Sequence, residues 1–143
     1  MAEAEAPIGD SRPARERPLS PHLQIYKWPV TMATSIAHRV TGVGNALGML
    51  LLAWWLIALA SGPDAYEIVR AAMASFPGRL VLFGFTLSLV FHSLNGVRHL
   101  FWDAGHGFGL RTARATGLLV FVLTVLVALA IWALAYAAAG GAP

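Results

Sequence analysis

The stretch ATGLLVFVLTVLVALAIWALAYAA, residues 115–138, decides the fold of this chain. It contains no Asp, Glu, Lys or Arg. A helix needs about 20 apolar residues to cross the roughly 30 Å of hydrocarbon in a bilayer. Because backbone groups in lipid must be hydrogen-bonded within their own segment, a run this long and continuous predicts a transmembrane helix. A transmembrane barrel would instead show short segments of alternating polarity.

Two further stretches of the same kind precede it. One has no charged residue from 40 to 63, and the other lies between Arg79 and Arg98. Together the three stretches predict spans at about 30–60, 78–103 and 114–138. The fold class that follows is an all-α membrane protein with three transmembrane helices.

Composition agrees with lipid as the main solvent. Hydrophobic residues make up 57% of the 143 residues and charged residues 12%, whereas an ordinary globular domain has about 25% charged residues. The net charge of +3 does not indicate nucleic acid, because no basic cluster is interleaved with aromatic residues on one face. The chain has no cysteine, which excludes disulfides, thiolate metal sites and cysteine nucleophiles.

Residues 1–17 differ from the rest of the chain. They are rich in charged residues and proline, so they cannot bury a core and are expected to be mobile. They contain no apolar run typical of a signal peptide, and their acidic residues are atypical of a mitochondrial transit peptide. Residues 18–143 then form the three-helix transmembrane domain.

Basic residues predict the orientation of the spans. The N-terminal side holds Arg12, Arg15, Arg17 and Lys27, and the loop between the second and third spans holds Arg98, Arg111 and Arg114. In the loop between the first and second spans, Arg70 and Arg79 are offset by Asp64 and Glu67. Cytoplasmic segments carry the excess of Lys and Arg. The N-terminus and the loop between the second and third spans are therefore expected in the cytoplasm, with the C-terminus outside. Because residues 1–17 are atypical of a mitochondrial transit peptide, the bacterial cytoplasmic membrane is favoured over the mitochondrial inner membrane.

Polar residues inside the first two spans lie on one face of each helix. The first span has Ser35, His38, Arg39 and Gly42, at positions i, i+3, i+4 and i+7. The second has Ser88, His92, Asn95, Gly96, His99 and Asp103. A central Arg costs about 2.5–3.5 kcal/mol on insertion scales. These faces are therefore expected to meet each other, a partner subunit or a cofactor rather than lipid.

His92 is the candidate metal ligand. A neutral imidazole is a common metal ligand and serves as an axial ligand of haem iron. The alternative is a histidine that only hydrogen-bonds across a helix interface. If His92 binds haem, a second axial ligand has to come from His38 or from another polypeptide, because His99 lies two turns away on the same helix.

Arg39 and Ser35 have two interpretations each. Arg39 either extends to the lipid headgroups or binds a carboxylate such as a haem propionate. Ser35 either bonds to its own helix or donates to a neutral carbonyl such as that of a quinone.

Near the end of the second span, His99, Arg98, Trp102 and Asp103 are interpreted as an interfacial collar, in which Arg98 extends to the lipid headgroups and Trp102 anchors the helix. The alternative is a proton-conducting rim next to a redox site.

Two motifs at their spacing resemble the cytochrome b556 subunits of succinate dehydrogenase. The first comprises RPLSPHLQIY at 17–26 and SIAHRVTG at 35–42. The second is HSLNGVRHL at 92–100, followed by Trp102 and Asp103. The similarity covers residues 17–138, with the three spans in the order expected for that family.

The resemblance implies a specific assembly and site. A subunit of this family completes a helical bundle with a second membrane anchor subunit, and the two hold an iron–sulfur subunit and a flavoprotein subunit on the membrane. One haem b lies between the anchors, so His92 is expected to be one axial ligand and the partner's histidine the other. Ser35 and Arg39 are expected to line a site for ubiquinone or a related quinone, His38 and Arg39 to lie near the haem propionates, and Asp103 to lie at the quinone-site rim.

The implied function is that of a membrane-anchor cytochrome b subunit of succinate:quinone oxidoreductase, serving the tricarboxylic acid cycle and respiratory electron transport. Succinate itself would be oxidised on another subunit. Two alternatives stay open: an anchor of a fumarate reductase, which runs the reverse flux, and a structural anchor without haem, in which the polar faces only join subunits.

Overall fold

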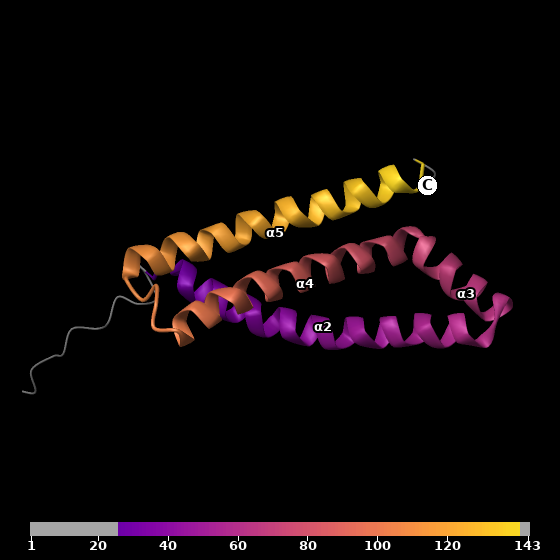
Figure 1. The fold of residues 1–143 in the computed structure, drawn as a ribbon, viewed down its shortest axis with the longest axis horizontal. Coiled ribbons are helices and arrows are strands. Elements are labelled where there is room, and N and C mark those ends of the chain that lie inside the picture. The colour runs from indigo at the N-terminus through magenta and orange to yellow at the C-terminus, as the bar shows by residue number, and fades with distance from the viewer. Residues whose placement is uncertain (1–25, 141–143) are drawn as a thin grey trace, which may run out of the picture.

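The computed structural model describes residues 26–140, and within that range the chain is helical without strands. The elements are α2 (Val30–Ser61), α3 (Pro63–Ala74), α4 (Phe76–Asp103) and α5 (Leu110–Ala138). The three long helices run lengthwise, with α3 joining α2 to α4 at one end (Figure 1). The predicted mobility of residues 1–17 and the boundary at residue 18 lie outside the described residues.

The three long helices confirm the predicted membrane spans. α2, α4 and α5 have 32, 28 and 29 residues and are each long and apolar enough to cross a membrane. The helix that contains the third predicted span begins at Leu110, four residues before the predicted start of that span. Exposed Arg111 and Arg114 lie in its first turns. A helix continues into the headgroup region where long basic side chains reach water, so charges do not mark its end.

The connection between the first two spans contains α3, a helix that the sequence prediction lacks. Its start has the features of a helix N-terminus, with Pro63 at the first position and Asp64 in the first turn. Val69 is only 1% exposed and attaches the helix to the rest of the fold. On its outer face Arg70 lies 2.7 Å from Glu67, and this hydrogen-bonded partner holds the pKa of Glu67 below its usual value.

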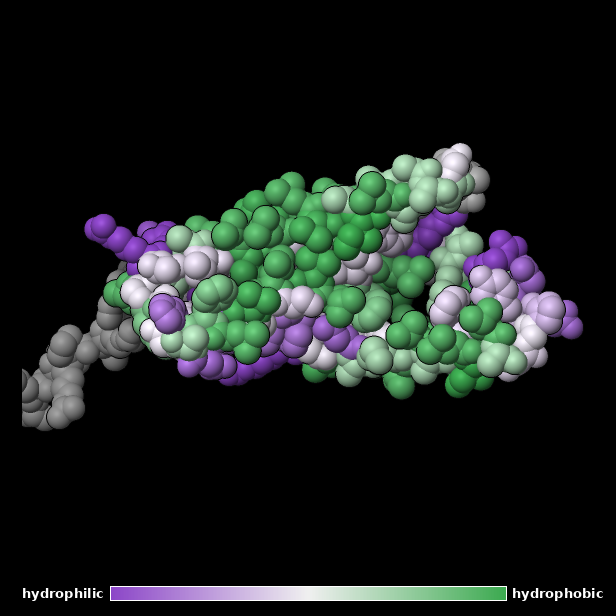
Figure 2. Space-filling model, viewed as in Figure 1, coloured by the Kyte–Doolittle hydropathy of each residue, from purple (hydrophilic) through white to green (hydrophobic). Residues whose placement is uncertain are grey.

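Little of the described chain is buried, as expected for a protein whose main solvent is lipid. The buried apolar residues are mostly small: Ala58, Val69, Phe91, Ala113, Val120 and Ala128. Small residues let helix backbones approach closely in membranes, where packing replaces the hydrophobic effect as the driving force. Figure 2 shows apolar surface over the middle of the molecule and hydrophilic residues at the ends and along one edge over α2 and α4.

The arrangement of the spans places the connections at opposite ends. The start of α2 and the α4–α5 connection lie at one end, and α3 and the end of α5 lie at the other (Figure 1). The two segments rich in Arg and Lys, before α2 and between α4 and α5, are therefore expected on the same side of the membrane. Which side faces the cytoplasm stays a prediction.

The α2–α4 contact depends on a glycine. A Cβ on Gly48 would overlap the ring of Phe85 on α4, whereas a Cβ on Gly84 would meet nothing within 4 Å. We expect Gly48→Ala to cost about 1–3 kcal/mol, the usual cost of overpacking, and to lower the Tm of the purified complex. Gly84→Ala is the matched control and should leave the Tm unchanged or slightly raised. Equal Tm values for the two variants would contradict this packing.

Candidate functional site

His92 lies on the face of α4 that packs against α2. Its Nδ1 is 3.2 Å from the carbonyl oxygen of His38 and 3.3 Å from Oγ1 of Thr41. Because a carbonyl oxygen only accepts, Nδ1 carries the hydrogen and donates it across the interface. A Cβ on Gly42 would lie 3.3 Å from Cε1 of His92, so the missing side chain at this position leaves room for the ring.

Three imidazole rings gather at this interface, and we call His38, His92 and His99 the histidine cluster. The rings of His38 and His92 stack with centroids 3.9 Å apart and planes 10° apart. The His99 ring lies 5.1 Å from the His38 ring, tilted by 48°. The predicted meeting of polar faces from the first two spans is thus confirmed for these residues.

The free ring atoms of the cluster fit a haem. Within residues 26–140 no hydrogen bond engages Nε2 of His92, and a histidine whose Nδ1–H is held by a carbonyl presents Nε2 to a metal in the usual way. Nδ1 of His38 is buried without a hydrogen-bond partner in the described chain, and a carboxylate would satisfy it. Within residues 26–140 no three His, Cys, Asp or Glu side chains are arranged to hold a metal ion together, and an axial haem site does not require such a group.

A second set of hydrogen bonds joins α2 and α4 one turn from His92. The hydroxyl oxygen of Ser88 lies 2.9 Å from the carbonyl oxygen of Thr41 and 2.8 Å from Oδ1 of Asn45, so its single hydrogen is shared between these two acceptors. Sequence reasoning named Ser88 but missed Thr41 and Asn45. Continuing the helical i, i+3, i+7 spacing from His38 reaches both.

Ser35, Arg39 and Asp103 lie outside the packed interface. All three are exposed, and none makes a side-chain hydrogen bond or ion pair with another residue in the described range. Ser35 and Arg39 share α2 with His38, and Asp103 is the last residue of α4. The structure thus brings His38 to His92 and leaves the other three predicted site residues on the surface of this chain.

The Arg98 side chain does not extend from this chain toward the lipid headgroups, so that part of the expectation is wrong. Its side chain is 6% exposed and lies between the helices, where Nη2 donates to the carbonyl oxygen of Ala113 at 2.8 Å. Asn95 is fully buried and accepts from Arg98 at 3.4 Å instead of lying in the histidine cluster. Five donors and several neutral acceptors make burial of this arginine tolerable.

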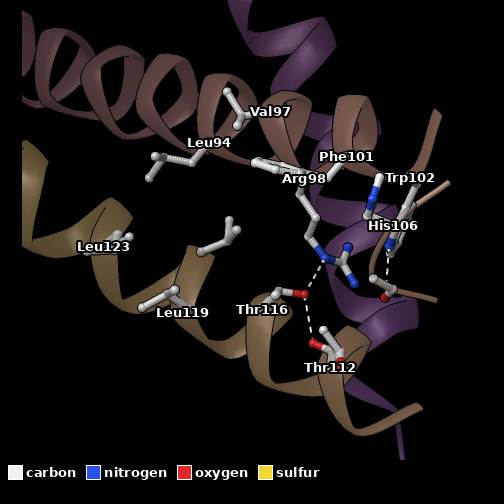
Figure 3. Close-up of a pocket in the computed structure, with 12 residues that line it drawn as sticks. Leu94, Val97, Arg98, Phe101, Trp102, His106, Thr112, Thr116, Leu119 and Leu123 are labelled. Atoms are coloured by element: carbon white, nitrogen blue, oxygen red, sulfur yellow. Dashed lines mark hydrogen bonds between the residues drawn. The ribbon is translucent and has the colours of Figure 1, made fainter. Parts of the chain in front are cut away.

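A separate cavity of about 370 Å³ lies between α4 and α5. Arg98 enters it from α4 and hydrogen-bonds Thr116 of α5, while apolar side chains form the walls (Figure 3). None of the five predicted site residues lines this cavity. It is therefore distinct from the histidine cluster.

Comparison with known proteins identifies relatives that match most of this chain. A family model described as succinate dehydrogenase/fumarate reductase transmembrane subunit matches residues 13–131. The succinate dehydrogenase cytochrome b556 subunit of Paracoccus denitrificans is 39% identical over 118 residues, covering 78% of this chain and 91% of the relative. The corresponding subunit of Rickettsia typhi is 37% identical over 117 residues, covering 82% and 91%. The mitochondrial succinate dehydrogenase cytochrome b560 subunit of Homo sapiens is 37% identical over 112 residues, covering 77% and 66%.

Proposed function

Because this chain belongs to the family of succinate dehydrogenase and fumarate reductase transmembrane subunits, as a membrane-anchor cytochrome b subunit, we propose that His92 is one axial ligand of a haem b held between this chain and a second membrane anchor. We further propose that the end of the molecule with the start of α2 and the end of α4 forms part of a quinone reduction site. The predicted family is confirmed by these matches. The relatives compared above are named as succinate dehydrogenase subunits, which favours succinate oxidation over the reverse flux.

The observation that carries the proposal is the orientation of the His92 ring. The carbonyl oxygen of His38 lies 3.2 Å from Nδ1 of His92 and accepts its hydrogen. This hydrogen bond makes Nε2 the metal-binding nitrogen and raises its basicity. Haem b bound there would supply a one-electron redox centre. Nδ1 of His38, buried without a partner in the described chain, and the Arg39 guanidinium are suited to hold the haem propionates.

Arg39 and Ser35 are suited to a quinone. Both are exposed on the same face of α2, one turn apart, so a ligand between this chain and a partner subunit reaches both. The Ser35 hydroxyl donates to a quinone carbonyl, and the Arg39 charge stabilises negative charge that develops on the ring oxygens. Asp103, exposed at the end of α4, is placed to pass protons from water toward a site at this end.

The partners follow from the same proposal. The chain assembles with other succinate dehydrogenase subunits; we assign these as a second membrane anchor, an iron–sulfur subunit and a flavoprotein subunit. The iron–sulfur and flavoprotein subunits deliver electrons to the quinone, so the quinone site has to lie on the side of the membrane where they bind. The basic residues indicate that this side is the cytoplasm. The start of α2, with Lys27, and the α4–α5 connection then lie in or near the cytoplasm, and α3 lies on the opposite side.

Co-purification tests the proposal. An affinity tag on this chain, expressed in its native membrane, is expected to recover three further subunits, succinate:quinone reductase activity and a b-type optical spectrum. A complex that reduces quinone but shows no haem bands would support the structural-anchor alternative. Recovery of this chain alone after mild detergent solubilisation of native membranes would contradict the assigned assembly.

A further inference from the structure

The guanidinium of Arg98 is anchored to α5. Nε donates to Oγ1 of Thr116 at 3.0 Å, and Nη2 donates to the carbonyl oxygen of Ala113 at 2.8 Å. Figure 3 shows the side chain reaching from α4 to Thr116. Two donors directed at two acceptors on one helix hold the planar group in a defined orientation.

The same guanidinium is also tied to α2. Nη1 lies 3.5 Å from Oγ1 of Thr34, a residue that is 1% exposed. Within residues 26–140 no carboxylate lies within 4 Å of Arg98, so neutral acceptors alone compensate its charge. A buried cation without a carboxylate partner is costly in a membrane, and such residues are generally retained for a function of their charge or geometry.

One face of the guanidinium covers an aromatic ring that leads to the histidine cluster. Cζ of Arg98 lies 4.0 Å from the centroid of the Trp102 ring. The Trp102 and His99 rings meet edge to face, with centroids 5.0 Å apart and planes 83° apart. We call Trp102, His99, His38 and His92 the ring column. Its successive centroids beyond Trp102 lie 5.0, 5.1 and 3.9 Å apart.

We propose that Arg98 is a positioning residue for His92: anchored to α5 and α2, it fixes Trp102, and the ring column transmits that position to the imidazole at its far end. The proposal rests on the proposed function, because it takes His92 to be the axial haem ligand. It assigns to Arg98 and Trp102 a role that differs from both interpretations of these residues from the sequence, an interfacial collar and a proton-conducting rim.

The physical basis is close packing. Packed rings have few alternative arrangements, so a displaced Trp102 has to be accommodated by its neighbours. Residues beyond the ligand orient the ligating ring and thereby tune the metal. The ferric low-spin electron paramagnetic resonance signal of a bis-imidazole haem depends on the relative orientation of the two ring planes, so it reports displacement of His92 even when haem stays bound.

The experiment compares variants in the assembled complex. Arg98→Met and Trp102→Leu are expected to shift and broaden the highest-g haem signal while the haem content per complex stays the same. Trp102→Phe, which keeps a ring at this position, and Arg111→Met, which removes an exposed arginine, are the matched controls and should keep the native signal. His92→Ala is the reference for loss of the ligand.

A native signal in Trp102→Leu would overturn the proposal, because this variant interrupts the ring column while leaving the hydrogen bonds of Arg98 to α5 intact. Should either apolar variant fail to assemble, Arg98→Lys decides instead: a shifted signal supports the proposal and a native signal overturns it. If His92→Ala itself keeps the native signal, the proposed haem ligand is wrong. If His92→Ala loses the signal and Trp102→Leu keeps it, only the positioning role fails.

Discussion

Replacing His92 with alanine is expected to abolish the bis-imidazole b-type spectrum of the assembled complex. The ring is held by its Nδ1 contacts to His38 and Thr41, and its Nε2 is the nitrogen suited to iron. Loss of an outer-shell partner already reduces metal affinity about 10- to 100-fold, so loss of the ligand itself should remove the native low-spin bands. Reduced-minus-oxidised optical spectra of complexes matched for flavin content measure the effect.

His106→Ala is the matched control for this prediction. His106 lies in the connection between α4 and α5, is exposed and lies outside the histidine cluster. Its replacement should leave the spectrum unchanged, which separates a ligand effect from a general effect of removing imidazole. A native spectrum in His92→Ala would remove the ligand assignment, whatever the control shows.

Replacing Arg39 with leucine is expected to lower succinate:quinone reductase activity about ten- to a hundredfold. A hydrogen bond to a charged group contributes about 1.5–3 kcal/mol, and each 1.36 kcal/mol is about tenfold in rate. Arg39 is exposed and has no hydrogen-bond or ion-pair partner in the described chain, so its removal should not disturb the helix packing. Reduction of an artificial dye by succinate, which does not need the quinone site, should persist.

Two comparisons make the Arg39 result interpretable. Arg111→Leu removes an exposed arginine near the same end of the molecule and should retain both activities. Equal loss of quinone and dye reduction in Arg39→Leu would mean that the substitution disrupts assembly, and the quinone assignment would fail. A selective loss together with a raised KM for quinone would identify Arg39 as a contact in the bound state.

Hydropathy predicts the spans well because lipid imposes one requirement on every residue of a spanning helix. α2 and α4 therefore match their predicted stretches to within two residues at either end. The start of α5 and the presence of α3 were missed because water relaxes that requirement outside the membrane. There, local features such as Pro63 and Asp64 decide helix formation, and they carry less information than a long apolar run.

The candidate site could be predicted only where two helices of this chain meet. Helical spacing placed His38 and His92 on inward faces, and the structure stacks their rings. Spacing did not distinguish a buried Arg98 from an arginine that extends to the lipid headgroups, because its acceptors, Thr116 and the Ala113 carbonyl, come from another helix. Ser35 and Arg39 are exposed on this chain, so the proposed quinone contacts depend on surfaces that this chain does not supply.

A structure of the complete complex, determined by electron cryo-microscopy with quinone present, tests the central claim most directly. It is expected to show Nε2 of His92 bonded to haem iron, with Ser35 and Arg39 beside the quinone ring. Nε2 of His92 facing lipid or another side chain, with the nearest iron beyond bonding distance, would contradict the account.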